Sequence, residues 1–170
     1  MKNTLVSLIA VTTILLSSCG GNKQDGKTTK VKNVEISVEK DSYKPGEKDA
    51  LIILKAYADK DLETLKSYAG FAQTNVMDED YFKTNSNVSS FREKIASWNG
   101  SFDEIRYYED DINFQHVYFM VAVFHENPET EQLTAVGLKS LDKEKWKMSG
   151  FGTKYIKKEK LAEMSTELPE

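Results

Sequence analysis

The sequence holds few of the residues from which metal and redox sites are made: one cysteine and two histidines among 170 residues. One cysteine cannot form a disulfide within the chain, and this set offers no spaced ligands for a structural zinc site. No block of Lys and Arg interleaved with aromatic residues occurs, and the formal net charge is −4. No P-loop, dinucleotide-binding glycine motif, zinc-protease helix or nucleophile elbow is present. The sequence therefore predicts no metal, no cofactor and no nucleic-acid partner.

Aromatic and charged residues are plentiful by contrast. The chain has 8 Tyr, 8 Phe and 2 Trp, and 29% of its residues are charged. This composition is typical of a folded protein with an aromatic core. A chain of this length is enough for one domain and too short for two full cores.

The N-terminal 18 residues are typical of a secretory signal. Lys2 precedes an apolar run from Leu5 to Leu16, which is shorter than the roughly 20 residues that a spanning helix needs. The run ends in Leu16-Ser17-Ser18-Cys19, which resembles the lipobox of bacterial lipoproteins. The resemblance implies that residues 1–18 are removed and that Cys19 becomes the acylated first residue of the mature chain.

Acyl chains on Cys19 are then the expected contact with the membrane. Gly20 and Gly21 are not the aspartate that this family uses as an inner-membrane retention signal. The resemblance therefore implies a lipid anchor in the bacterial cell envelope, in the outer membrane if the host has one. Residues 19–32 are polar and glycine-rich, so we expect them to form a flexible tether.

Residues 33–156 are expected to form one α+β domain. Val34, Ile36 and Val38 alternate with polar residues, as in a half-buried strand. Apolar residues then recur at helical spacing over Glu47 to Ala58, and Asp61 is placed to cap a second helix. A third helical stretch, which Asn85-Ser86-Asn87 interrupts, ends near Asn99-Gly100.

From residue 102 onward the apolar period changes to two, which predicts strands. The expected strands are Phe102–Ile112, Gln115–His125, Gln132–Leu141 and Lys145–Ile156. Helices followed by four antiparallel strands define an α+β arrangement. Residues 157–170 are expected to form a charged C-terminal tail, helical around Leu161 to Met164.

The stretch Gln115–His125 is apolar at both odd and even positions, so both of its faces are expected to be buried. The predicted helices can cover only one face of the sheet. Three alternatives remain for the second face: the Val34–Val38 segment, the C-terminal tail or another protein molecule.

The stretches A-Y-A-D-K-D-L-E-T-L, from Ala56, and K-W-K-M-S-G-F, from Lys145, give the chain a resemblance to the nuclear-transport-factor-2-like (cystatin-like) superfamily. This resemblance implies a curved antiparallel sheet that wraps the helices into a cone with a pocket at its open end. It also implies a homodimer formed through the sheet surface. The superfamily contains isomerases, dehydratases and non-enzymatic modules, so it does not select an activity.

Several side chains are candidates for a pocket within this fold. The aromatic residues that either line a pocket or fill the core are Phe71, Trp98, Tyr118, Trp146 and Phe151. If the protein is an enzyme, its carboxylate base is expected among Asp103, Asp110 and Asp111. The two histidines, His116 and His125, are nine residues apart, so a regular strand directs them to opposite faces, away from a shared metal.

From the sequence we expect a lipid-anchored, extracytoplasmic binding or accessory module without catalysis, whose ligand and protein partner are unknown. One alternative is a small-molecule isomerase or lyase that uses a carboxylate in the cone. The other is an envelope lipoprotein that binds or inhibits a protein partner, for which an exposed apolar patch is the expected sign.

Overall fold

The computed structural model describes residues 42–170. The predicted signal peptide, Cys19, the tether and the Val34–Val38 strand lie outside the described residues. The chain divides into two units, Met1–Lys30 and Val31–Glu170, and the described residues belong to the second unit.

Five helices precede the sheet in the described part of the chain. Asp61 caps α2 as predicted, because its side chain accepts a hydrogen bond from the Thr64 amide at 3.0 Å. Asn85 caps α5 in the same way, through the amides of Asn87 and Val88. The bounds are α1 Glu47–Asp59, α2 Leu62–Tyr68, α3 Phe71–Thr74, α4 Tyr81–Thr84 and α5 Ser86–Ala96.

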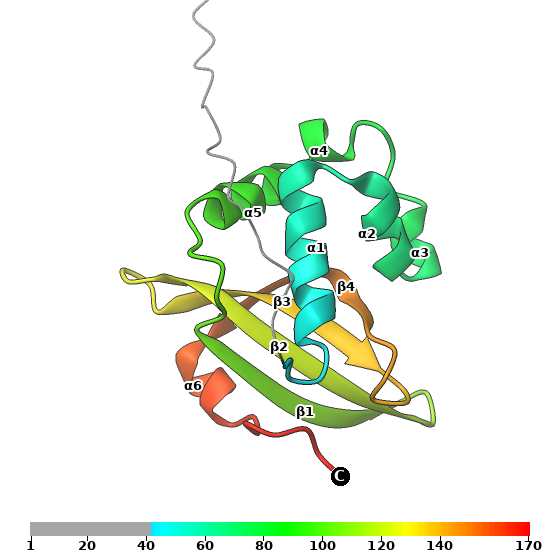
Figure 1. Ribbon diagram of the computed structural model, residues 1–170, viewed down its shortest axis with the longest axis vertical. Helices are drawn as coiled ribbons and strands as arrows, with labels where there is room; N and C mark the ends of the chain where they lie inside the picture. Colours follow the sequence, from blue (N-terminus) through cyan, green and yellow to red (C-terminus); the bar gives the residue numbers. More distant parts are fainter. Residues whose placement is uncertain (1–41) are drawn as a thin grey trace, which may run out of the picture. The chain divides into compact units, whose positions relative to one another are not determined.

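Four antiparallel strands follow as a meander, in the spatial order β1-β2-β3-β4 (Figure 1). The strands are β1 Glu104–Ile112, β2 Gln115–Asn127, β3 Gln132–Ser140 and β4 Lys147–Lys157. The predicted α+β class is therefore confirmed, and each of the four strands predicted from residue 102 onward is present. Bulges shift the register between Val123 and His125 and between Val136 and Leu138.

The helices α1 to α5 lie on one side of the sheet, which we call the helical face, and α1 crosses directly over it (Figure 1). Even-numbered residues of β2, among them Met120 and Phe124, pack there with Leu54 of α1 and Phe91 of α5 in one buried cluster. Gly46 allows α1 to approach closely, because a Cβ atom there would lie 2.9 Å from the Met120 sulfur.

The opposite face of the sheet, which we call the second face, is partly covered by the C-terminal tail. The helix α6, Lys158–Ala162, lies on that side of the sheet (Figure 1). Its Leu161 is 2% exposed and packs in a cluster with four residues of β2 and β3: Val121, Val123, Leu133 and Ala135.

The tail continues to the far edge of the sheet. Ser165 pairs with Tyr107 of β1 through two backbone hydrogen bonds of 2.8 and 2.9 Å. Further on, the Lys143 ammonium donates to the Pro169 carbonyl at 2.7 Å, and Leu168 packs against the main core. Of the three alternatives for covering the second face, the described residues therefore show the C-terminal tail in contact with it. No helix among residues 42–170 has the length and hydropathy needed to cross a bilayer.

Candidate binding pocket

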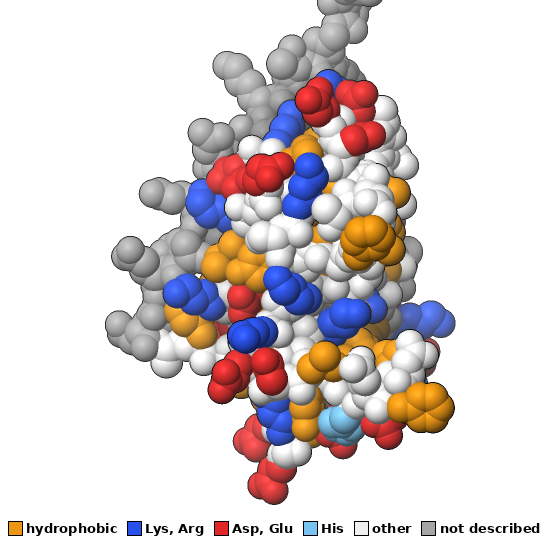
Figure 2. Space-filling model, turned by 90° about the vertical axis from the view of Figure 1, so that its right-hand side faces the viewer, with side chains coloured by type: hydrophobic (Ala, Val, Ile, Leu, Met, Phe, Trp, Pro, Cys, Tyr) orange, Lys and Arg blue, Asp and Glu red, His pale blue; other side chains and the backbone are white. Residues whose placement is uncertain are grey.

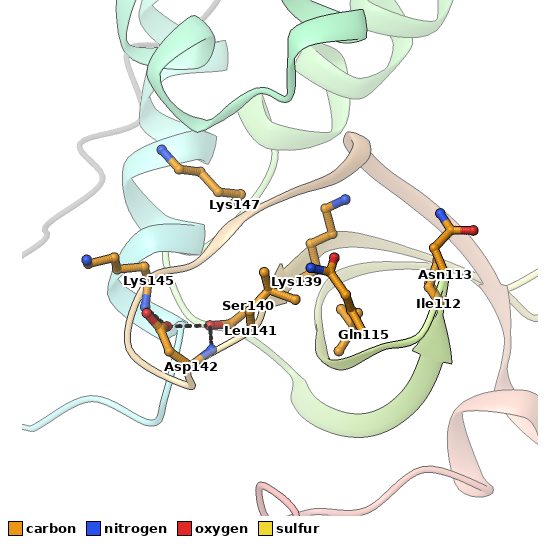
Figure 3. Close-up of a pocket in the computed structure, with 10 residues that line it drawn as sticks. Ile112, Asn113, Gln115, Lys139, Ser140, Leu141, Asp142, Lys145 and Lys147 are labelled. Atoms are coloured by element: carbon orange, nitrogen blue, oxygen red, sulfur yellow. Dashed lines mark hydrogen bonds between the residues drawn. The ribbon is translucent and has the colours of Figure 1, made fainter.

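A pocket of about 420 Å³ opens at the end of the sheet where the β1–β2 and β3–β4 turns meet. In the register, Ile112 pairs with Gln115, and the side chain of Val117 lies on the same face as that of Gln115. Lys139 of β3 pairs with Lys147 of β4. Figure 3 shows Lys145 and Lys147 on one side of the pocket, Ile112 and Asn113 on the other, and Leu141 and Gln115 between them.

The pocket belongs to the part of the second face that lies beyond the α6 cluster. Its apolar lining consists of Val117, which is 5% exposed, and of Ile112 and Leu141, which are 41% and 59% exposed. Exposed aliphatic side chains beside a buried valine give the pocket an apolar wall that faces water. Such a surface is available for an apolar ligand group.

Three lysines also line the pocket: Lys139, Lys145 and Lys147. Within residues 42–170, no carboxylate forms an ion pair with any of them. The Lys147 ammonium donates to the Ser67 carbonyl at 2.5 Å and lies 5.8 Å from the Tyr68 ring, so α2 holds it in place. Figure 2 shows several Lys or Arg side chains on the face that this view presents, between hydrophobic ones.

The only acidic residue among those lining the pocket, Asp142, is engaged by its own turn. Its Oδ1 atom accepts hydrogen bonds from the Ser140 hydroxyl and from the amides of Glu144 and Lys145, at 3.0, 3.0 and 2.8 Å. These backbone hydrogen bonds, that of Lys145 first, lower the pKa of Asp142. Asp142 therefore fixes the turn that carries Lys145.

The β1–β2 turn beside the pocket has an unusual sequence for its backbone. Asn113 and Phe114 both have positive φ, 51° and 63°, as a two-residue type I′ turn requires. Glycine is the usual second residue, because a side chain in this conformation costs energy. Phe114 is nevertheless present there and is fully exposed, so its ring gains nothing from the fold in return.

On the helical face, next to this turn, His116 lies between two carboxylates. Its Nδ1 atom is 2.9 Å from Asp111 and its Nε2 atom 3.3 Å from Glu109. The hydrogen bond to Asp111, followed by that to Glu109, raises the pKa of His116. A bulge does occur between the two histidines, but nine residues of strand span roughly 30 Å, so His125 is far from this cluster.

The five predicted aromatic residues separate into core and surface. Trp98 and Trp146 are buried in the main core, where their indole N–H groups donate to the carbonyls of Ser101 and Lys143. Tyr118 is partly buried against that core, under the Lys143 ammonium. Phe71 and Phe151 are instead 87% and 46% exposed. Phe71 starts a helix of four residues, which is too short to turn an apolar face inward.

The three predicted acids do not converge on one site. Asp103 lies exposed before β1, and Asp110 and Asp111 lie exposed near the other end of that strand. Adjacent strand residues point to opposite faces, so Asp110 and Asp111 diverge. Of the two tyrosines nearest these acids in β1, Tyr107 donates its hydroxyl to the Pro45 carbonyl at 3.0 Å, and burial raises its pKa. Burial, followed by the charge of Asp110, raises the pKa of Tyr108.

Sequence reasoning missed the lysine-lined pocket. A signal was available, because Lys139, Lys145 and Lys147 are all odd-numbered and flank one predicted turn, but their pairing depends on the turn length. Across residues 42–170, no group of three or more His, Cys, Asp and Glu side chains is arranged to hold a metal ion. Comparison with known proteins found no matching family model, curated protein or solved structure.

Proposed function

We propose that the protein is a lipid-anchored, extracytoplasmic binding module without catalytic activity, built on a cone-like, nuclear-transport-factor-2-like domain. The lipobox at Leu16–Cys19 supports the anchor and the location in the bacterial envelope. The order of helices followed by an antiparallel meander supports the cone-like fold.

The observation that carries the binding function is the pocket between the two turns. Its volume of about 420 Å³ lies within the range of roughly 300–1,000 Å³ typical of small-molecule sites. It combines an apolar wall with polar groups at its rim, which is the composition that such sites use to bind and orient a ligand.

Native mass spectrometry of the mature protein, compared with its denatured mass, tests this function. A bound small molecule that disappears on denaturation is the expected result. The bare polypeptide mass, together with no binding of any small molecule at the pocket, would overturn the proposal.

The anchor is tested separately by the Cys19→Ala variant. We expect this variant to leave the membrane fraction, because it carries no acyl chain. Continued membrane retention would contradict the lipid anchor. The test does not depend on which ligand the pocket binds.

A protein-docking function is the second candidate, and exposed apolar side chains favour it. Phe114 and Phe71 are the most exposed large apolar residues of the described chain, and Val76 is 53% exposed. Exposed aromatic residues of this kind are enriched at protein interfaces. A homodimer is the simplest form of this candidate, and a monomeric mass at tens of micromolar would count against it.

The three candidate acids of the isomerase or lyase alternative are exposed and do not gather at one site, and Asp103 lines a separate pocket with Glu47 and Phe102. A carboxylate base of such an enzyme is normally held beside its substrate in a pocket. Substituting Asp103 by Asn is expected to leave ligand binding at the pocket between the two turns unchanged, because Asp103 does not line that pocket.

A further inference from the structure

We propose that the pocket between the β1–β2 and β3–β4 turns binds an amphipathic anion, with a phosphate or carboxylate head at the lysines and an apolar chain along the aliphatic wall. This inference rests on the proposed binding function and names the chemical class of its ligand. The two halves of the pocket carry the argument separately.

The first half of the pocket carries the positive charge of three lysines, although the protein as a whole is acidic. Lys139 and Lys147 are direct partners across β3 and β4, and Lys145 lines the same pocket. Like charges opposite each other on neighbouring strands are destabilising. The whole chain has a net charge of −4, yet no described carboxylate forms an ion pair with these three lysines.

Lysines outside the pocket are of both kinds. Lys55, Lys83 and Lys160 each pair with a carboxylate three or four residues away. Lys48, Lys60 and Lys154 form no ion pair with a described carboxylate either, so the pocket is distinguished by bringing three such lysines together.

At the pocket, Asp142 is used to fix the turn through its three hydrogen bonds. The charge of Asp142 also acts on Lys145 without forming an ion pair, and the Lys147 ammonium already donates to the Ser67 carbonyl. An anionic ligand would add a countercharge at Lys139 and Lys145.

The second half is the aliphatic wall formed by Val117, Ile112 and Leu141. Ile112 and Leu141 stand at the ends of adjacent turns, with Val117 buried between them. Inorganic phosphate has no apolar group to cover these side chains, and a neutral hydrocarbon has no charge for the lysines. A molecule with both parts would contact both the lysines and the aliphatic wall.

The direct test measures calorimetric binding of octyl phosphate, at concentrations where it does not form micelles, to the chain from Gly20 to Glu170. This chain contains the whole compact unit Val31–Glu170 with both of its buried clusters, so it carries its own core. We expect octyl phosphate to bind at least about tenfold more tightly than inorganic phosphate or neutral octyl glucoside, since each lacks one class of contact.

Substitutions assign this binding to the pocket. The double variant Lys139→Gln, Lys145→Gln is expected to weaken octyl phosphate binding at least about tenfold, because charge-assisted hydrogen bonds are lost. The matched control Lys55→Gln, Lys83→Gln removes two positive charges from the helices and is expected to leave binding unchanged.

Leu141→Ser tests the apolar wall, with Val76→Ser as the control at a similarly exposed position. Circular dichroism checks that every variant is folded.

Two sources of this chemistry are distinguished by adding vesicles of phosphatidylglycerol. Binding of octyl phosphate but not of vesicles assigns the site to a free amphiphile, whereas vesicle binding that depends on Lys139 and Lys145 assigns it to a membrane lipid. If octyl glucoside binds as tightly as octyl phosphate, or if the lysine variants do not weaken binding, the ligand is not an anion, although the proposed binding function still holds. No binding of any amphiphile would overturn the inference, and a bare mass in native mass spectrometry as well would overturn the proposed function.

Discussion

The two faces of the sheet bury apolar residues of the same strand by different means. Helices α1 and α5 pack on the helical face, where Met120, Ala122 and Phe124 are at most 3% exposed. On the second face, α6 covers Val121 and Val123, whereas the region from Val117 towards the turns opens into the pocket. A strand that is apolar on both faces therefore indicates that other elements pack on each face. On the second face, the surface that α6 leaves uncovered is available for a ligand.

The helical face is expected to show the largest effect of mutation. Phe91 is fully buried and contacts Tyr57 and Phe124 edge to face, at 5.1 and 5.2 Å between ring centroids. Phe91→Ala is expected to lower the free energy of unfolding by about 3–5 kcal/mol, because it removes the ring and leaves a cavity. Urea unfolding measures this change. The control Phe71→Ala, at an exposed position, is expected to change stability by less than about 0.5 kcal/mol.

The second face is expected to depend on one side chain of α6. Leu161→Ala is expected to lower stability by about 2 kcal/mol, the low end for a buried leucine, since α6 has five residues and can adjust around the gap. Trypsin cleavage after Lys157, Lys158 and Lys160 should accelerate, because local opening of the tail becomes easier. A loss as large as that of Phe91→Ala would show that the two covers contribute equally.

The β1–β2 turn is expected to respond in the opposite direction. Phe114→Gly should raise the free energy of unfolding by about 1 kcal/mol, since glycine adopts the positive φ of this turn without a side-chain clash. Thermal unfolding measures the gain. If the exposed ring docks on a protein partner, the same variant loses that association, so that stability and binding change in opposite directions. A lower melting temperature would contradict the turn assignment.

The smallest expected effect is the pH dependence of the His116 cluster. Its pKa is raised above the ordinary 6.5 by Asp111 and Glu109, so the cluster stabilises the folded state below about pH 6.5. This contribution disappears as the pH rises through the raised pKa. His116→Gln should therefore cost more stability near about pH 5 than near about pH 9. An NMR titration of His116 provides the direct check, and a pKa at or below 6.5 would contradict the geometry.

Much of this fold follows from local sequence signals. Asp61 and the strand alternation predict the start of α2 and the four-strand meander, because capping and period depend on neighbouring residues alone. The bulges at Val123–His125 and Val136–Leu138 carry no comparable signal, and they decide which residues pair further along the strands. The pocket depends on that pairing. Lys139 meets Lys147, and Ile112 comes near Leu141, only after the turn lengths and the register are fixed.

The sequence predicts that Phe71 lines a pocket or fills the core, but its side chain is exposed. A phenylalanine near other apolar residues is normally assigned to a core, and the sequence gives no reason to expose it. In the structure it begins α3, whose four residues have no buried member. Burial here depends on the path of the chain between α2 and α4, which composition does not determine.

We claim that α6 covers one part of the second face and that the uncovered part binds the ligand. Backbone amide NMR shifts of the chain from Gly20 to Glu170, recorded as octyl phosphate is added, test this claim most directly. We predict shifts concentrated in Ile112–Val117 and Lys139–Lys147, with residues Lys158–Ala162 and the helices unchanged. Shifts centred on α6 or on the helical layer, or no saturable shifts, would contradict a binding site where the cover of the second face ends.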